Sequence, residues 1–187
     1  VVGGIIDPKE ADEMIDQGKC DFVALARPLT AEPDFPKKAE SGNADDINPC
    51  IRCYKCFPGV IEGVDISELP SLFGCTVNPR AFITDDEFLC REAENRKKVL
   101  VIGGGIAGMT AAVTACDQGH SVTLVDDKDE LGGVMFYTDT DYYKTDMNRF
   151  KQVMIRRVKN RDIHLEHKRI VPQDIAGYGA DAVIVAV

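Results

Sequence analysis

Positive charge is scarce in this sequence. Against 31 aspartate and glutamate residues it has 22 lysine and arginine residues, which gives a formal net charge of −9 over 187 residues. Such a field repels phosphate backbones, so we expect no nucleic-acid partner. No apolar run is long enough to span a bilayer, and no signal-peptide pattern opens the chain. We therefore expect a cytoplasmic protein without a membrane partner.

Histidine is also rare, with three residues in the whole chain. His164 and His167 lie in the segment IHLEH, which reads as a strand. Successive side chains of a strand point to opposite faces, so His167 shares a face with Ile163 and Leu165 while His164 faces the other way. We expect no shared ligand role for the two imidazoles.

Cysteine, by contrast, occurs seven times. Four of these residues are grouped in the text NPCIRCYKC and CTVNPR, as Cys50, Cys53, Cys56 and Cys75. In a reducing compartment, closely spaced cysteines are more often metal ligands or catalytic groups than disulfides, and an odd count fits a disulfide framework poorly. Three cysteines form the unengaged remainder: Cys20, Cys90 and Cys116.

The spacing of the first three grouped thiols, Cys-x2-Cys-x2-Cys, is that of three of the four ligands in bacterial ferredoxin runs. It favours an iron–sulfur cluster over zinc, because zinc sites usually combine two separated Cys-x2-Cys pairs. Zinc and free buried thiols remain the alternatives. Spacing alone does not choose Cys75 over Cys90 as the fourth ligand.

The first thirty residues predict one β-α-β step of a parallel sheet. VVGGII reads as a buried strand, Asp7 caps a helix, and DFVALAR at 21–27 reads as a second buried strand. Glycine N–H groups and a guanidinium at the carboxyl ends of these strands are suited to binding a phosphate monoester. The alternative is that the glycines only form a turn and the arginine is a solvated surface charge. The residues concerned are Gly3, Gly4, Ala26 and Arg27.

A dinucleotide-binding pattern begins at residue 98. The pattern starts with a strand at 98–102, which leads into the text GxGxxG. A helix at 106–118 and a strand at 121–125 follow, and an acid comes directly after the second strand, as this pattern requires. The three glycines would permit, in turn, the tight turn, the approach of a pyrophosphate and the close packing of helix on strand. They are Gly103, Gly105 and Gly108.

The anion of such a ligand would lie at the helix N-terminus, at Ile106 and Ala107, where unpaired N–H groups and the helix dipole favour negative charge. Asp126 would accept hydrogen bonds from the adenosine ribose. A second glycine turn, at Leu131-Gly132-Gly133, gives a flavin or a pyrophosphate another place to approach the backbone. A Gly-rich turn without a ligand is the alternative.

The C-terminal part of the pattern is basic and then apolar. The segment 144–169 has nine lysine or arginine residues against three acids, and its apolar residues recur at helical spacing. We expect its charges to form a solvated outer face rather than a docking patch. The closing text DAVIVAV predicts another parallel, buried strand.

Taken together, these motifs resemble the iron–sulfur flavoenzymes related to 2,4-dienoyl-CoA reductase and trimethylamine dehydrogenase, the long relatives of Old Yellow Enzyme. The matching text is GGIIDP, ALARPLTAEPDFPKKAESG, INPCIRCYKC, CTVNPRA, VLVIGGGIAGMTAA, VTLVDDKDELGG and DAVIVAV, which covers nearly the whole chain. The resemblance implies an FMN-phosphate corner at Gly3, Gly4 and Arg27. It also implies a [4Fe–4S] cluster held by Cys50, Cys53, Cys56 and Cys75. It further implies that the ADP half of FAD is bound by Gly103, Gly105, Gly108, Asp126 and Gly133.

Four features depart from the family pattern. Ala26 replaces the usual glycine before the phosphate-binding arginine, and Asp126 stands where glutamate is common. The spacer before Cys75 is longer than usual. The text DTDYYKTD at 139–146 replaces a segment rich in proline and glycine, which leaves the contacts to the flavin ring open.

We therefore expect an α/β protein made of three parts. Residues 1–45 would be the last β/α units of an FMN-binding TIM barrel, 46–96 a cluster-binding linker, and 97–187 the first part of a Rossmann-like domain for FAD or ADP. As the resemblance implies, electrons would pass from NAD(P)H through FAD and the cluster to FMN, to reduce an activated double bond of a small-molecule substrate. The catalytic residues would lie before Val1, so the chain, which reads as a fragment, would not be fully active alone.

Two alternatives stay open for the function. One is a non-catalytic module with structural ADP and zinc, and the other is an enzyme of the amine-dehydrogenase type that passes electrons outward. The sequence carries no prediction of the oligomeric state.

Overall fold

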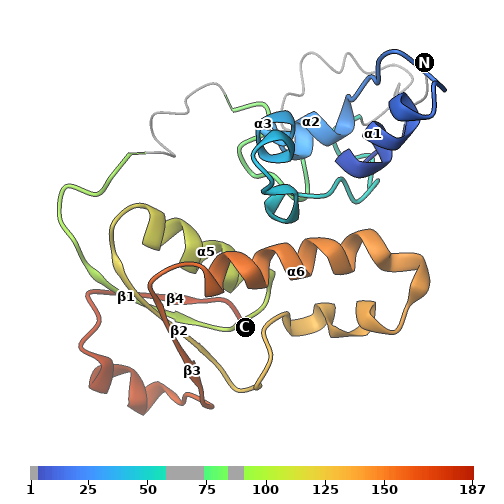
Figure 1. The fold of residues 1–187 in the computed structure, drawn as a ribbon. Helices are drawn as coiled ribbons and strands as arrows, with labels where there is room; N and C mark the ends of the chain where they lie inside the picture. Colours follow the sequence, from blue (N-terminus) through green and yellow to red (C-terminus); the bar gives the residue numbers. More distant parts are fainter. Residues whose placement is uncertain (1–3, 58–73, 84–90) are drawn as a thin grey trace, which may run out of the picture. The chain divides into compact units, whose positions relative to one another are not determined.

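The structure, a computed structural model, describes residues 4–57, 74–83 and 91–187 (Figure 1). The chain divides into two compact units, Val1–Asp86 and Glu87–Val187. Gly3 and Cys90 lie outside the described residues. Within the described part of the chain, no helix is long and apolar enough to cross a membrane.

The second unit is built on a four-stranded parallel sheet with the strand order β3-β2-β1-β4. Its strands are β1 (Lys98–Ile102), β2 (Ser121–Asp126), β3 (Ile163–His167) and β4 (Ala182–Val185). The strands expected at 98–102, 121–125 and IHLEH are therefore confirmed. Parallel order requires crossover connections, and these bring all four carboxyl ends to one edge of the sheet.

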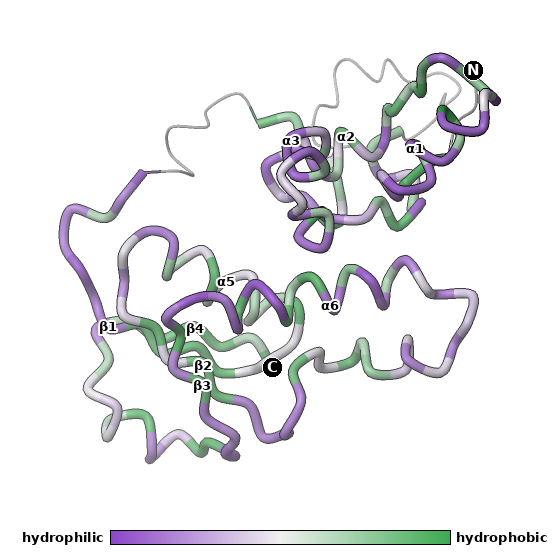
Figure 2. Tube along the Cα trace, viewed as in Figure 1, coloured by the Kyte–Doolittle hydropathy of each residue, from purple (hydrophilic) through white to green (hydrophobic). Residues whose placement is uncertain are grey.

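Two helices lie in the crossovers from β1 to β2 and from β2 to β3 and contribute to the core. α5 (Ile106–Asp117) packs on β1 and β2, and α6 (Thr145–Lys159) lies beside α5 (Figure 1). The middle of β1 and the whole of β4 are apolar, whereas β3 and α6 contain both apolar and polar residues (Figure 2). Buried side chains from the sheet and from the two helices form the core. They are Val99, Leu100, Val101, Val122, Leu124 and Val125 from the sheet, Met109, Ala112 and Ala115 from α5, and Phe150, Val153, Met154 and Val158 from α6.

Short 3₁₀ helices complete this unit: η4 (Gly133–Asp139), η5 (Tyr142–Lys144) and η6 (Pro172–Tyr178). Two expectations for the unit are wrong. β4 is parallel but exposed, with Val185 66% exposed, because it is an edge strand whose one neighbouring strand in the described residues is β1. The basic segment is not wholly solvated either, since Lys151 is only 2% exposed.

The first unit contains the helices α1 (Pro8–Asp16), α2 (Arg27–Ala31) and α3 (Phe35–Glu40) and the 3₁₀ helix η1 (Ala44–Asp46). The expected cap of α1 is confirmed, because Asp7 Oδ1 accepts the N–H of Lys9 at 3.0 Å. The expected strands are not formed in the described residues 4–6 and 21–26, and Phe22 is 88% exposed. A parallel strand is stabilised by neighbouring strands, and the described residues of this unit include none.

Candidate functional site

A pocket of about 710 Å³ lies at the carboxyl ends of the four strands. In a doubly wound sheet this edge is the usual place for a ligand. The ends of β1 and β2, the residues directly after β3 and β4, the first turn of α5 and the start of η4 all contribute to its wall. The lining residues are Ile102, Gly103, Gly105, Ile106, Ala107, Val125, Asp126, Asp127, Lys128, Gly133, Val134, Met135, Lys168, Arg169, Ile170, Ala186 and Val187.

Two glycines allow the backbone to form this edge. Gly103 has φ 111°, a left-handed conformation that side chains rarely adopt, and a Cβ there would lie 2.4 Å from the carbonyl oxygen of Ala186. A Cβ on Gly108 would lie 1.7 Å from the carbonyl oxygen of Gly103. The helix therefore approaches the strand end more closely than any residue with a side chain allows.

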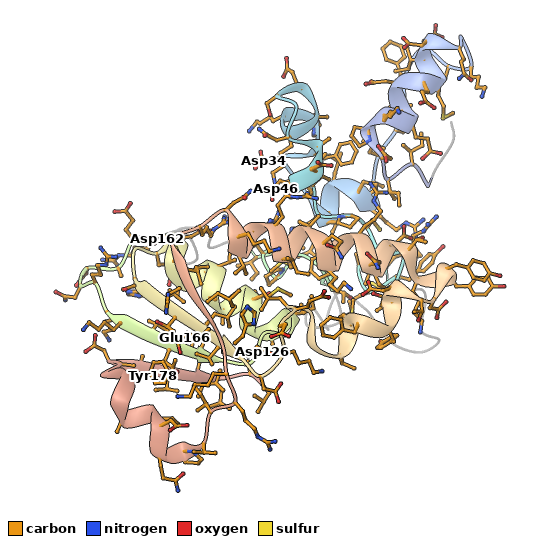
Figure 3. All side chains as sticks on the ribbon, turned by 60° about the horizontal axis from the view of Figure 1, so that its bottom comes forward. Asp34, Asp46, Asp126, Asp162, Glu166 and Tyr178 are labelled. Carbon is orange, nitrogen blue, oxygen red and sulfur yellow. The ribbon has the colours of Figure 1, made fainter. Side chains whose placement is uncertain are left out.

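Asp126 is held at the pocket wall by backbone groups (Figure 3). Its Oδ2 accepts the N–H of Gly104 at 2.5 Å, and its Oδ1 accepts the N–H of Lys128 at 2.9 Å. A carboxylate has about four acceptor positions, so two remain for ligand hydroxyls. Both bonds fix the orientation of the side chain before any ligand binds.

The second glycine turn lies against the first glycine loop. Gly132 donates its N–H to the carbonyl oxygen of Gly104 at 2.9 Å, and both Gly132 and Gly133 have positive φ, 137° and 54°. A Cβ on Gly133 would lie 2.9 Å from Cα of Gly105. The two turns thus form one glycine-lined edge, and the sequence pattern alone did not show that they touch.

Three basic residues of the pocket were missed by sequence reasoning: Lys128, Lys168 and Arg169. The last two belong to the segment expected to face solvent. Their position directly after a predicted strand was the available signal, because the residues that follow parallel strands gather at the ligand edge. They place positive charge beside Asp126 and Asp127 in the wall.

Beside this pocket, Glu166 connects two other polar side chains (Figure 3). His164 Nε2 lies 3.1 Å from Glu166 Oε1, and the Tyr178 hydroxyl donates to Glu166 Oε2 at 2.7 Å. His167 Nδ1 instead lies 2.7 Å from the carbonyl oxygen of Lys128. The two imidazoles have different partners, as expected from the strand pattern.

The titration of Tyr178 is a testable consequence. The hydrogen bond to Glu166 is the main cause that raises the pKa of Tyr178 to about 12, and burial and nearby negative charge add to it. The unfolded chain would lose this proton near pH 10, at about the usual tyrosine pKa. Any stability that the bond gives is therefore fully present below about pH 10 and is lost as pH rises through about 12.

Tyrosinate absorbance, taken as wild type minus Tyr178→Phe, should titrate near pH 12. The difference isolates this residue from the other four of the five tyrosines in the chain. If the difference absorbance titrates near pH 10 instead, the hydrogen bond between Tyr178 and Glu166 is contradicted. Tyr142→Phe serves as a control on another tyrosine.

In the first unit, the cysteine region forms a loop around Cys53. Its Sγ lies 3.1 Å from the Thr76 hydroxyl. Burial raises the pKa of Cys53, but hydrogen bonds from Thr76 and from backbone groups outweigh it, so the pKa is lowered overall. Burial is the main cause that raises the pKa of Cys75, and the negative charges of Cys53 and Cys56 add to it. These three thiols therefore lie within electrostatic reach of one another.

The backbone of this loop has an uncommon conformation. Arg52 and Tyr54, which flank Cys53, have φ 53° and 60°, values that residues other than glycine seldom adopt. Such a local cost is typical of functional loops. The described part of the chain nevertheless contains no group of three or more histidine, cysteine, aspartate or glutamate side chains arranged to hold a metal ion, and its six cysteines are free.

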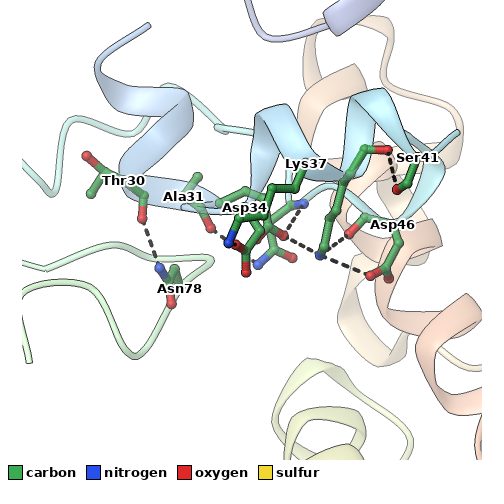
Figure 4. A network of polar contacts seen from close by, with 10 residues as sticks. Thr30, Ala31, Asp34, Lys37, Ser41, Asp46 and Asn78 are labelled. Atoms are coloured by element: carbon green, nitrogen blue, oxygen red, sulfur yellow. Dashed lines mark hydrogen bonds and ion pairs between the residues drawn. The ribbon is translucent and has the colours of Figure 1, made fainter. Parts of the chain in front are cut away.

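Two asparagines attach both arms of the cysteine region to α2. Asn48 donates to the carbonyl oxygen of Ala31 at 3.3 Å, and Asn78 donates to that of Thr30 at 2.9 Å (Figure 4). Asn48 lies two residues before Cys50, and Asn78 lies three residues after Cys75. Adjacent carbonyls of one short helix thus bring together segments that are far apart in the sequence.

A buried ion pair supports the same junction. Glu32, only 6% exposed, accepts from Lys38 Nζ at 2.7 Å and from the N–H of Asn48 at 3.3 Å. Lys38 Nζ also lies 3.0 Å from Asp46 Oδ2 (Figure 4). The charges of Glu32 are therefore satisfied by a cation and a backbone donor, as burial requires.

We predict that Asn78→Ala destabilises the first unit by about 1 to 3 kcal/mol, the usual cost of leaving buried polar groups unpaired. It removes the bond to Thr30 and also the acceptor of the Arg80 N–H, which lies 3.0 Å from Asn78 Oδ1. Urea unfolding measures the loss, and the rate at which Cys75 is alkylated should rise. Asn43→Ala, at an exposed asparagine, is the matched control; equal stability of the two variants contradicts the prediction.

Arg27 has one buried atom without a partner. Its Nη1 is inaccessible to solvent and makes no hydrogen bond within the described residues, and its guanidinium lies 4.6 Å from the centre of the Tyr54 ring. At Gly4, which is predicted to belong to the same phosphate corner, an added Cβ would meet no atom within 4 Å. Ala26 is exposed and precedes α2.

The chain thus consists of a cysteine-rich first unit and, later in the sequence, a parallel α/β unit with a glycine-lined pocket at the carboxyl ends of its strands. A family model described as FAD dependent oxidoreductase matches residues 98–175. NADH oxidase of Thermoanaerobacter brockii is 43% identical over 132 residues, which are 71% of this chain and 20% of that protein. Bilirubin reductase of Mediterraneibacter gnavus is 33% identical over 186 residues, 99% of this chain and 28% of that protein.

The solved structure of 2-naphthoyl-CoA reductase in complex with 2-naphthoyl-CoA matches 96% of this chain with a TM-score of 0.85 and 27% identity. The chain spans 27% of that structure, so it spans about a quarter of the length of these relatives. These matches confirm the resemblance inferred from the motifs. The chain is related to the flavin-dependent oxidoreductases of the trimethylamine dehydrogenase and dienoyl-CoA reductase type.

Proposed function

We propose that the chain is the electron-transfer segment of a flavin- and [4Fe–4S]-dependent oxidoreductase, which takes electrons from NAD(P)H and reduces an activated double bond of a small-molecule substrate. The observation that carries the proposal is the pocket at the carboxyl ends of the sheet, with its two glycine turns and its fixed acid. Reductases and an NADH oxidase among the relatives support the direction of electron flow inward.

In this proposal, the ADP half of FAD occupies the pocket. The helix N-terminus at Ile106 and Ala107 would bind the pyrophosphate, since its N–H groups have no partner within the helix. Asp126 would accept the ribose hydroxyls through its two remaining acceptor positions. Asp126 would also disfavour a 2′-phosphate by charge repulsion.

The cysteine region would hold the cluster through Cys50, Cys53, Cys56 and Cys75. In favour of this fit, Cys53 and Cys56 lie close enough to Cys75 for their charges to raise its pKa, and backbone groups hydrogen-bond to Cys53 and Cys75. Hydrogen bonds to sulfur stabilise thiolate and tune clusters. Since no described group is arranged for a metal ion, binding would require the loop to close further.

The first unit, in the same proposal, contributes to a phosphate site for FMN. The partnerless buried Nη1 of Arg27 is the observation in its favour, because a guanidinium fork binds a phosphate by two bonds. Residues 1–45 would then be the end of the barrel, 46–96 the cluster segment and 97–187 the nucleotide domain. A nicotinamide delivers two electrons together, whereas a cluster carries one at a time. Because flavins can exchange either one or two electrons, a cluster between two flavins can pass electrons from one to the other.

Cofactor analysis of anaerobically purified protein tests the proposal. Iron and acid-labile sulfide in equal amounts, together with bound FAD, are expected. Zinc without sulfide, with ADP and no flavin, would instead support the non-catalytic module. A protein that reacts with an amine and not with NAD(P)H would support the amine-dehydrogenase alternative.

A further inference from the structure

Lys151 is the largest side chain that is fully buried among the described residues, with 2% of its surface exposed. It lies in the middle of α6, in the basic segment that was expected to face solvent. Burying an ammonium group costs free energy unless it is paired. A buried lysine at this position therefore needs a specific set of partners.

Those partners all belong to η4, the 3₁₀ helix that follows the second glycine turn. Lys151 Nζ forms an ion pair with Asp139 Oδ1 at the end of η4 and lies 5.5 Å from the centre of the Phe136 ring. Asn148, on the same side of α6, also donates to Asp139 Oδ1 and to the carbonyl oxygen of Thr138. α6 is thereby attached to the last turn of η4.

The stem of Lys151 contacts the start of the same segment. A Cβ on Gly132 would lie 2.9 Å from Cδ of Lys151 and 3.4 Å from its Cγ, so the methylene groups pack on the bare Cα. Gly132 in turn donates to the carbonyl oxygen of Gly104. One side chain thus fixes both ends of η4 while lying against a turn that touches the first glycine loop.

We propose that Lys151 is a positioning residue for the dinucleotide: it holds the Gly132-Gly133 turn against the first glycine loop and so sets the shape of the pocket wall. The inference rests on the proposed function of this pocket.

The test compares Lys151→Met with Lys159→Met, a change at an exposed lysine of the same helix. Calorimetric titration of nucleotide-free protein with ADP should show about a tenfold or greater rise in Kd for Lys151→Met and no change for Lys159→Met, the range typical of losing a supporting residue. Hydrogen exchange gives an independent readout. The Gly132 amide should exchange faster in Lys151→Met, whereas the Gly103 amide, bonded to Val125, should not change.

If Lys151→Met does not fold, Asp139→Asn keeps the test decisive: Asp139 is 41% exposed, and the amide oxygen of asparagine can still accept a hydrogen bond from the buried Lys151 Nζ while the ion pair is lost. The same change in ADP affinity and in Gly132 exchange is expected, of smaller size. If wild-type protein binds ADP and the variants lose thermal stability but keep their ADP affinity, the positioning role is overturned and the proposed function is not. Wild-type protein that fails to bind ADP overturns the proposed function and this role with it.

Discussion

Gly108→Ala is expected to remove measurable binding of ADP and FAD. The added methyl group would lie 1.7 Å from the carbonyl oxygen of Gly103, far inside any real contact; the position of the Cβ is fixed by the helix backbone, and the oxygen is itself a backbone atom. The helix must therefore move off the strand end. A misplacement of about 1 Å at a binding site can weaken its function about a hundredfold.

The same change should destabilise the second unit by about 1 to 3 kcal/mol, the usual cost of overpacking. Calorimetric titration measures the affinity, and thermal unfolding followed by circular dichroism measures the stability. Gly177→Ala in η6 is the matched control, because its methyl group would meet no atom within 4 Å. Stability of this control should stay within about 0.5 kcal/mol of wild type. Undiminished ADP affinity in Gly108→Ala would contradict the packing role of this glycine.

Cys53→Ser is the second change with a large expected effect. The pKa of the Cys53 thiol is lowered, its Sγ lies 3.1 Å from the Thr76 hydroxyl, and the residue lies between two left-handed residues, all of which suit a thiolate ligand. We expect loss of iron and of acid-labile sulfide together, because a cluster needs all of its corners. Visible absorbance and metal analysis of anaerobically purified protein measure both.

Cys116→Ser is the control, since Cys116 lies in the other unit and its Sγ contacts the carbonyl oxygen of Asp162 at 3.8 Å. It should keep the full cluster content. Cys75→Ser and Cys90→Ser then decide the fourth ligand: loss of the cluster in the first and retention in the second is the expected pair. The reverse result would assign Cys90, and retention of the cluster in Cys53→Ser would refute the ligand set.

Local periodicity was enough for the nucleotide unit. The strands at 98–102 and 121–125 and the helix after Gly105 were predicted to within a residue of their observed ends, because the strand, glycine loop, helix and second strand follow one another in the sequence and the two strands pair with each other. The same reasoning failed for 21–27. An apolar run predicts a strand only if partner strands exist, and propensity cannot supply a partner.

Burial was the quantity that local pattern predicted least well. Lys151 and Val185 have opposite exposures from those expected, a buried lysine and an exposed edge valine. Each exposure depends on the neighbours of the residue in space. Lys151 is covered because it packs against Asp139 and Gly132, and Val185 is exposed because it lies at an open edge of the sheet. Lys168 and Arg169 were missed for the same reason, because the sheet order brings the end of β3 to the pocket.

By itself, then, the sequence determined the glycine loop, the acid after the second strand and the spacing of the thiols, since these are patterns of residue type and spacing along the chain. Only the tertiary structure decided that both glycine turns share one edge, that Asn48 and Asn78 attach the two cysteine arms to adjacent carbonyls, and that a buried lysine supports the pocket wall. These contacts join residues distant in the chain, and their geometry exists only after the chain has packed.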